Sequence, residues 1–446
     1  MYFLYSVLVL AFFVVVSPWF LYQAIRYRKY IGSLSQRMGY LPVSFNMDAE
    51  PSIWIHAVSV GEVLTARPLV RELRARYPRL RIFLSTTTLT GQGIARRSVR
   101  DVDEVFYFPF DLPLFVRRTL DLVRPRLFIM METEIWPNLL RECRRRGVKT
   151  AIVNGRLSQR SYPRYRLVRG FMNRVLDDID SFCVQSEESA RRFIDLGANP
   201  GRVTVTGSLK FDSLELSTNT QSRARDRVLR YFRVPSGRPV IVAGSTMKGE
   251  ESAVLGAFRR VRSTVPSALL ILAPRHIERA DDVEALSQEE GFKTVRRSEL
   301  AIDAEPRADV VILDSIGELA TIYQLATVSF VGGSLVATGG HNILEPAVFG
   351  KPIVFGPHMS NFAEIAETFV SNAAAVQVAS DGELDEAMMA LMTDPIRRAR
   401  LGAAARAIVE ANRGAKDKSM TVLSALVPQD HTTTYPSNVR PFRPIA

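Results

Sequence analysis

The chain has 446 residues, of which 47% are hydrophobic and 23% are charged, a composition typical of a folded globular protein long enough for two domains. The net charge of +12 favours an anionic partner, such as an anionic membrane, a phosphorylated ligand or nucleic acid. The two cysteines, Cys143 and Cys183, have no second Cys or His at metal-ligand spacing. This predicts buried free thiols and argues against a zinc site or a disulfide framework.

The first 25 residues, MYFLYSVLVLAFFVVVSPWFLYQAI, form an apolar run that is long enough to cross a bilayer. Basic residues, among them Arg26, Arg28 and Lys29, follow the run and predict a cytoplasmic main body. A cleaved signal peptide would have a charged start and a small-residue cleavage site, and neither is present. We therefore expect a single-pass anchor at residues 1–25. A helix lying in the membrane interface is the alternative, because Pro18 could break the span.

From residue 52 onward, short apolar runs such as IWIHAV, RIFLSTTT and RLFIMMETE alternate with stretches of helical spacing. The pattern lapses over residues 213–238 and then restarts with PVIVAGST, ALLILAPRH and ADVVILDS. Such alternation predicts parallel sheets that are covered by helices on both faces. We predict two doubly wound, Rossmann-like α/β domains, over residues 40–215 and 235–427, followed by a flexible tail over residues 428–446. Two such domains facing each other would form a cleft for a ligand.

Polar side chains follow several strands of the N-terminal half. Glu62, in SVGE, comes directly after a strand and could serve as a general base, or could only stabilise the start of a helix. Glu132 and Glu134, in METEIWPN, are two residues apart, and in an extended segment they would face opposite ways. We therefore expect at most one of these two to face the cleft. Arg156 and Lys210 add basic groups at later strand ends, where a lysine could neutralise an anionic ligand.

The C-terminal half has features suited to a phosphorylated ligand. AGSTMKGEE places glycines and hydroxyls at a strand-to-helix turn, and Arg275 follows another strand, where it could bind a phosphate. Gly317 would allow a close approach to a ligand. Asn342 and Glu345 are three residues apart after a glycine-rich loop, where the carboxylate could hold a ribose. Ordinary turn chemistry, or an N-cap with its capping-box partner, is the alternative at these positions.

Taken in chain order, the segments form a specific series over residues 50–415: SVGE, METEIWPN, NGRLS, GSLKFD, APRH, GEL, VGGSL, GGHNILEPA and GPHMSNF. This series resembles the 3-deoxy-D-manno-octulosonic acid (Kdo) transferases of lipopolysaccharide synthesis, which have the GT-B glycosyltransferase fold. The resemblance implies an inverting transfer of Kdo from CMP-Kdo to the lipid A precursor, lipid IVA. One position departs from the family, because Met247 stands where a histidine is usual.

The resemblance also assigns roles to residues of this chain. Glu62 matches the general base, and Glu132 and Lys210 match positions that support the transition state. The CMP-binding segments of the family match Pro274 and Arg275, then Ile316, Gly317 and Glu318, and then Asn342, Ile343, Leu344 and Glu345. We expect no cofactor and no metal, because a CMP-sugar has a single phosphate and needs no diphosphate clamp.

The same resemblance places the protein at the bacterial inner membrane, with its catalytic domains on the cytoplasmic side. There, anionic lipid would attract a basic surface. A GT-B enzyme with another nucleotide-sugar donor is the first alternative, since one fold serves many donors. A membrane-anchored basic protein that binds nucleic acid is the second. We expect no nucleic-acid partner, because no stretch of the sequence interleaves aromatic and basic residues along one face.

Overall fold

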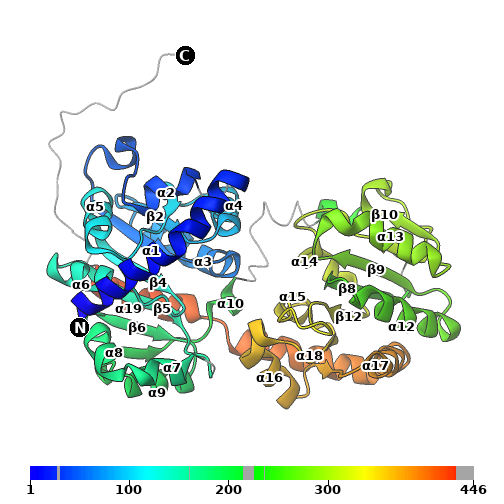
Figure 1. Cartoon of the computed structure of the whole chain (residues 1–446). Coiled ribbons are helices and arrows are strands. Elements are labelled where there is room, and N and C mark those ends of the chain that lie inside the picture. The colour runs from blue at the N-terminus through cyan, green and yellow to red at the C-terminus, as the bar shows by residue number, and fades with distance from the viewer. Residues whose placement is uncertain (28–30, 160, 214–225, 236, 428–446) are drawn as a thin grey trace, which may run out of the picture. The chain divides into compact units, whose positions relative to one another are not determined.

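The computed structural model describes residues 1–27, 31–159, 161–213, 226–235 and 237–427. It comprises two compact units (Figure 1). Unit 1 is Met1–Ser213 with Arg413–Ala446, and unit 2 is Leu214–Asn412. The predicted tail over residues 428–446 lies outside the described residues, as do Arg28 and Lys29.

Unit 1 contains a seven-stranded parallel sheet of order β3-β2-β1-β4-β5-β6-β7. The strands are β1 (Ser52–His56), β2 (Arg81–Thr86), β3 (Glu104–Tyr107), β4 (Pro125–Met131), β5 (Lys149–Gly155), β6 (Ser181–Val184) and β7 (Val203–Val205). The helices are α1 (Tyr2–Tyr27), α2 (Ile31–Arg37), α3 (Val60–Arg76), α4 (Leu89–Ser98), α5 (Pro113–Val123), α6 (Pro137–Arg145), α7 (Tyr162–Leu167), α8 (Arg169–Leu176), α9 (Glu187–Asp195), α10 (Leu209–Asp212) and α19 (Ala415–Leu426). Short 3-10 helices cover Val43–Asn46 and Pro200–Arg202.

Unit 2 repeats this architecture with a second seven-stranded parallel sheet, of order β10-β11-β9-β8-β12-β13-β14. Its strands are β8 (Val240–Thr246), β9 (Leu269–Pro274), β10 (Thr294–Arg296), β11 (Val310–Ile312), β12 (Val328–Val331), β13 (Ile353–Phe355) and β14 (Val376–Gln377). The helices are α12 (Glu250–Thr264), α13 (Ala280–Glu289), α14 (Leu319–Ile322), α15 (Leu344–Ala347), α16 (Ala363–Ser371), α17 (Asp381–Thr393) and α18 (Pro395–Ala411). Short 3-10 helices cover Ile277–Arg279, Arg297–Glu299, Tyr323–Leu325 and Ser360–Phe362.

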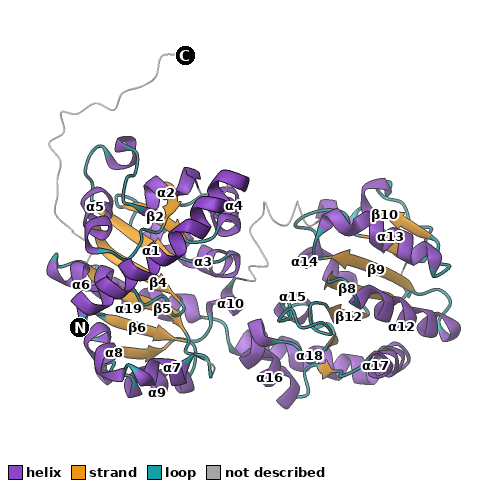
Figure 2. Ribbon diagram, in the orientation of Figure 1, coloured by secondary structure: helices purple, strands orange, loops and turns teal. Residues whose placement is uncertain are grey.

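The central strands are buried on both faces, which explains why they read as continuous apolar runs in the sequence. In β1, every residue is fully buried. Trp54 belongs to the apolar cluster on one face of the sheet, whereas Ile53 and Ile55 belong to the cluster on the other face. Helices cover both faces of the two sheets (Figure 2). The predicted pair of doubly wound α/β domains is therefore confirmed.

The strand orders place a topological switch point in each sheet. In unit 1 the chain leaves β1 towards β2 and β3, and later returns to place β4 on the other side of β1. In unit 2 the same reversal separates β8 from β12. Open parallel sheets bind ligands at the carboxyl ends of the strands on either side of such a point. The topology therefore directs attention to the loops that follow β1 and β4, and to those that follow β8 and β12.

The last described helix, α19, belongs to unit 1, and its predicted place in the C-terminal domain is wrong. The chain crosses back at Asn412, so that α19 packs against α3 and α10. Asp212 fixes the start of α19, because its carboxylate accepts hydrogen bonds from Gly414 N at 2.8 Å and Lys416 N at 2.7 Å. Tyr77 fixes its other end by donating to the carbonyl of Val427 at 2.9 Å. These contacts join segments about 200 and 350 residues apart, which a local pattern cannot reveal.

The predicted transmembrane anchor is not supported. Among the described residues, no helix combines the length and the apolar character that a membrane span requires. The first turns of α1 instead pack on unit 1 beside α6. Tyr2 donates a hydrogen bond to Asp178 at 2.6 Å, and Tyr5 donates one to Asp111 at 2.9 Å. These bonds hold polar groups of α1 against the domain.

Candidate functional site

A cluster of carboxyl groups lies at the switch point of unit 1. Glu62 is in the first turn of α3, directly after β1, and is only 9% exposed. Its Oε2 accepts a hydrogen bond from Val58 N at 2.9 Å, and its Oε1 accepts one from Ser59 Oγ at 3.0 Å. Burial, and next the charge of Glu132, raise the pKa of Glu62 to about 7. The carboxyl group is thus oriented by two donors and poised to exchange a proton near neutral pH.

Both acidic residues of METEIWPN lie within electrostatic reach of Glu62, although an extended segment would turn them opposite ways. The expectation that at most one of them faces the cleft stays a prediction. The chain is not extended after β4, because Glu132 has a φ of +56° and a turn follows. The turn lets Glu132 and Glu134 act electrostatically on each other and on Glu62. Burial, and next the charges of Glu62 and Glu132, raise the pKa of Glu134 to about 8. A non-glycine residue with positive φ is strained, and such strain is common at functional sites.

Lys210 lies on α10, which follows β7 at the same edge of the sheet. Helix α10 packs against α3, the helix that carries Glu62. The segment is held by Asn154, whose φ is +58° and whose Oδ1 accepts a hydrogen bond from Leu209 N at 3.0 Å. All three predicted catalytic residues are therefore in unit 1, at the carboxyl edge of one sheet.

The corresponding edge of unit 2 is organised by Glu250, which was not among the predicted site residues. This residue is fully buried in the first turn of α12. Its Oε2 accepts hydrogen bonds from Met247 N at 2.9 Å and Gly333 N at 2.7 Å. Its Oε1 accepts two more, from Ser334 N and Leu335 N, each at 2.8 Å. One carboxylate thus joins the loop after β8 to the glycine-rich loop after β12, across the switch point.

The hydrogen bonds of Glu250 show how the loop holds its shape with Met247 at the position where the family usually has a histidine. The residue contributes its backbone N–H to Glu250 and its carbonyl accepts from Glu250 N at 3.0 Å. Both bonds are independent of the side chain, so the loop keeps its shape without the usual histidine. The close approach of the two loops also requires a glycine at position 332, because a Cβ there would lie 2.6 Å from Ser245 O and from Thr246 Cα, and 2.9 Å from Glu250 Oε2.

The predicted donor residues lie in loops that follow β9, β11 and β12, at one edge of the sheet. Pro274 ends β9, and Arg275 follows it and donates its backbone N–H to Thr246 O at 2.9 Å. After β11, Ile316 is 89% exposed and Gly317 has a φ of +85°. This short segment therefore presents backbone, and an apolar side chain, to the outside of unit 2.

The carboxylate of Glu318 is already engaged within unit 2. Arg297 donates two hydrogen bonds to it, each at 2.8 Å, and Ser315 Oγ donates a third at 2.5 Å. The guanidinium of Arg297 in turn lies 3.5 Å from the centre of the Tyr231 ring. Any contribution of Glu318 to a ligand would therefore come from its backbone, or through the shape that its carboxylate gives to the loop.

Asn342 and Glu345 are in direct contact, as their spacing predicted. Asn342 Nδ2 donates to Glu345 Oε1 at 3.3 Å, and Asn342 Oδ1 accepts from Leu344 N at 3.1 Å. Burial raises the pKa of Glu345 to about 7, opposed by the hydrogen bond from Asn342 and by the charge of Arg275. Ile343, the remaining residue of this segment, is fully buried and precedes α15.

His341, in the same loop, was not among the predicted donor residues. Its Nε2 is buried and has no hydrogen-bond partner among the described residues. Burial, and next the positive charges of Arg275 and His276, lower the pKa of His341 to about 4. The basic groups of two loops therefore act on one another here, which suits an anionic ligand. A histidine directly after two glycines was the available sequence signal.

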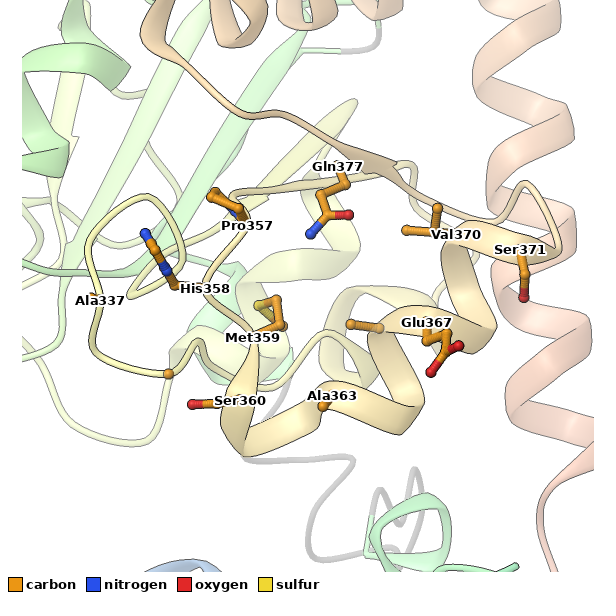
Figure 3. Close-up of a pocket in the computed structure, with 12 residues that line it drawn as sticks. Ala337, Pro357, His358, Met359, Ser360, Ala363, Glu367, Val370, Ser371 and Gln377 are labelled. Atoms are coloured by element: carbon orange, nitrogen blue, oxygen red, sulfur yellow. The ribbon is translucent and has the colours of Figure 1, made fainter. Parts of the chain in front are cut away.

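A cavity of about 610 Å³ adjoins the glycine-rich loop in unit 2 (Figure 3). It lies between that loop, the segment after β13 and α16. Its lining includes Gly339, His358, Met359, Glu367 and Gln377. None of the predicted donor residues lines it.

No group of three or more His, Cys, Asp or Glu residues with the geometry of a metal site occurs in the described parts of the chain. The expectation that the reaction needs no metal stays a prediction. Cys143 and Cys183 are free and buried, as predicted.

Solved structures share this fold. A crystal structure of UDP-GlcNAc 2-epimerase from Neisseria meningitidis matches 84% of this chain and 100% of that chain, with a TM-score of 0.57 and 11% sequence identity. At that identity the likeness concerns the fold alone. A family model described as glycosyl transferases group 1 matches residues 252–408. The two parallel α/β units and this match define a glycosyltransferase of the GT-B fold.

Sequence relatives give the family. A model described as 3-deoxy-D-manno-octulosonic-acid transferase (kdotransferase) matches residues 32–213. A 3-deoxy-D-manno-octulosonic acid transferase of Haemophilus influenzae is 37% identical over 401 residues, covering 89% of this chain and 91% of the relative. One of Bordetella pertussis is 34% identical over 379 residues, covering 83% and 86%. The chain belongs to the Kdo transferase family of lipopolysaccharide synthesis, and the resemblance drawn from the motifs is confirmed.

Proposed function

We propose that the protein transfers Kdo from CMP-Kdo to a lipid A precursor such as lipid IVA, with inversion at the anomeric carbon. The observation that carries the proposal is the buried, doubly hydrogen-bonded Glu62 at the switch point of unit 1. In this scheme unit 1 binds the acceptor and unit 2 binds the donor. Membership of the Kdo transferase family supports the sugar that is moved.

Glu62 is the general base of the proposed reaction. An acceptor hydroxyl attacks the anomeric carbon of Kdo, the new glycosidic bond forms, and the bond from that carbon to the phosphate oxygen of CMP breaks. The hydroxyl proton passes to Glu62, and CMP leaves with its phosphate charge. A pKa raised to about 7 lets this carboxyl group be ionised before the attack and protonated after it. Glu132 and Lys210 support the transition state at the same edge of the sheet.

The nucleotide is held by the loops at the carboxyl edge of the unit 2 sheet. Arg275 neutralises the phosphate, and Glu345, oriented by Asn342, accepts hydrogen bonds from the ribose. The leaving group is a single phosphate monoester, so the proposal requires no metal ion and no cofactor.

The deciding experiment compares wild type with Glu62→Gln in transfer from CMP-Kdo, generated in situ, to a tetraacylated lipid A precursor, read by mass with a chelator present. We expect a mass gain of one or more Kdo units with wild type, and at least a hundredfold lower turnover with the variant. Both proteins should bind CMP equally, which is the matched control. If the variant lost CMP affinity by as large a factor as it lost turnover, the role of Glu62 as base would be contradicted. A folded wild type that binds CMP but transfers nothing would favour another nucleotide-sugar donor or another acceptor.

We also propose that the protein works at the cytoplasmic face of the bacterial inner membrane, with α1 lying on the membrane surface. One side of α1 faces unit 1, and the other leaves large apolar side chains exposed. Phe3 is 82% exposed, Leu8 60%, Phe12 68% and Val15 77%. Positions 8, 12 and 15 share one face of a helix. Such a face can insert into the boundary of headgroups and acyl chains, and the net charge of +12 adds attraction to anionic lipid.

Sedimentation with anionic vesicles tests this placement. The double variant Leu8→Glu, Phe12→Glu should shift most of the protein from the pellet to the supernatant. The control is Ile396→Glu, which changes an equally apolar side chain, 81% exposed, on α18. If the two variants sediment alike, α1 is not the membrane-binding surface. Melting temperatures close to that of wild type would show that both variants are folded.

A further inference from the structure

A buried histidine, His56, lies beside the carboxyl cluster of unit 1, and the proposed mechanism does not use it. His56 is the last residue of β1 and is fully buried. Its Nδ1 lies 3.2 Å from Ser85 O and 3.0 Å from Ser85 Oγ, and its ring stacks on Phe108 with 3.8 Å between centroids. These contacts fix the plane of the imidazole. Its Nε2 is buried and has no hydrogen-bond partner within the described residues.

The nearest acidic group to that orphaned nitrogen is Glu134. Its Oε2 lies 4.0 Å from His56 Nε2, about 1 Å beyond a hydrogen bond, which a small side-chain rotation can close. The Glu134 side chain is 26% exposed, so one side faces the open edge of the sheet. An unpaired buried nitrogen is costly, and a partner that can donate a proton to it removes that cost.

The groups that act on this pair come from several elements. Glu62 on α3 and Glu132 after β4 act on Glu134 with like charge. Glu134 in turn acts on the phenol of Tyr165 on α7, and Arg37 acts on His56 with positive charge. The charges of Glu62 and Glu132 disfavour a carboxylate at Glu134, and the charge of Arg37 disfavours an imidazolium at His56. A hydrogen bond from Trp136 opposes this by lowering the pKa of Glu134, but burial and the two like charges act more strongly. The surroundings therefore favour a pair in which both partners are neutral.

Burial favours the neutral form of both groups. It lowers the pKa of His56 to about 3 and raises the pKa of Glu134 to about 8. A neutral imidazole that donates from Nδ1 to Ser85 O keeps a lone pair on Nε2. That lone pair can accept a hydrogen bond only from a donor, and a protonated carboxyl group is one.

We propose that Glu134 is a positioning residue that remains a neutral carboxylic acid during catalysis, donating its proton in a hydrogen bond to Nε2 of His56. The inference rests on the proposed function of Glu62. Its consequence is that Glu62 and Glu132 are the two carboxyl groups of the cluster that carry charge in the reaction. A third negative charge would hold the proton on Glu62 and repel a donor that bears a phosphate. The pair thus keeps the base available near neutral pH.

The proposal predicts an alkaline limit to activity. As pH rises through about 8, Glu134 loses its proton, the hydrogen bond to His56 is lost, and a negative charge appears beside Glu62. At pH 9 about one tenth of the molecules would still hold the proton, so kcat/KM should fall about tenfold from its maximum. In Glu134→Gln the side chain amide donates to Nε2 at every pH, so this fall should be absent.

The test is the pH profile of kcat/KM from pH 6 to 9.5 for wild type, Glu134→Gln and Glu62→Gln. We expect Glu134→Gln to stay within about threefold of wild type at pH 7 and to exceed it about tenfold at pH 9. The proposal is overturned if Glu134→Gln is as inactive as Glu62→Gln at pH 7, because the ionised carboxylate would then be required. It is also overturned if the variant keeps the alkaline fall.

His56→Phe is an independent test of the pair. It keeps an aromatic ring stacked on Phe108 but removes Nε2, the proposed acceptor of the Glu134 proton. Without the acceptor the proton on Glu134 is held less firmly, so the alkaline fall should move to lower pH. An unmoved fall would count against the pair. Thermal melting and CMP binding of each variant separate a folding defect from the predicted shift. If Glu62→Gln proves fully active, the base assignment fails, whatever Glu134→Gln shows.

Discussion

The clamp made by Glu250 allows a quantitative prediction. Glu250→Gln keeps one oxygen, which can still accept two of the four backbone N–H groups, but it turns an NH2 group towards the other two. Two hydrogen bonds to a charged acceptor are lost, at about 1.5–3 kcal/mol each, so the loop should be destabilised by about 3–6 kcal/mol. The lower figure corresponds to about a hundredfold in a local opening equilibrium.

Hydrogen exchange read by mass spectrometry on the full chain is the assay, because it reports the amides concerned. Peptides that contain residues 333–335 should exchange at least a hundredfold faster in Glu250→Gln than in wild type, and CMP should bind more weakly. The matched control is Glu251→Gln, the same change at the next residue, where the carboxylate instead pairs with Arg279 at 2.8 Å. Unchanged protection of residues 333–335 in Glu250→Gln, or an equal loss in Glu251→Gln, would refute the reasoning.

Further predictions concern the base, the nucleotide site and the core. Because the pKa of Glu62 is raised on folding, the stability linked to its proton is lost as pH rises through about 7, so the melting temperature of wild type should fall relative to Glu62→Gln between pH 5 and 8. Glu345→Ala should weaken CMP binding in calorimetry by at least tenfold, and an unchanged affinity would exclude the ribose contact. In thermal melts Gly402→Ala should destabilise, since its Cβ would lie 2.0 Å from Gly350 O, whereas Gly256→Ala, which meets nothing within 4 Å, should stabilise by about 0.5–1 kcal/mol. Equal shifts for the two glycines would contradict the packing argument.

The sequence alone determined the features that depend on local patterns. Continuous apolar runs predict strands buried on both faces, and alternation with helical stretches predicts parallel sheets, because both signals come from neighbours in the chain. The contact of Asn342 with Glu345 followed from their spacing. The order of the motifs was specific enough to identify the family.

Only the tertiary structure decided which distant groups meet. Glu134 joins Glu62 because the backbone turns at Glu132, and an alternating pattern carries no sign of one residue at positive φ. Glu250 clamps a loop more than 80 residues away. The apolar composition of α1 suits a membrane span as well as a helix packed on a domain, and only the structure shows that Tyr2 and Tyr5 form hydrogen bonds with Asp178 and Asp111 of unit 1. An apolar side chain can be buried against many different surfaces, so its place in the sequence does not reveal its neighbour. A hydrogen bond requires one particular donor and acceptor, and the fold decides which two groups meet.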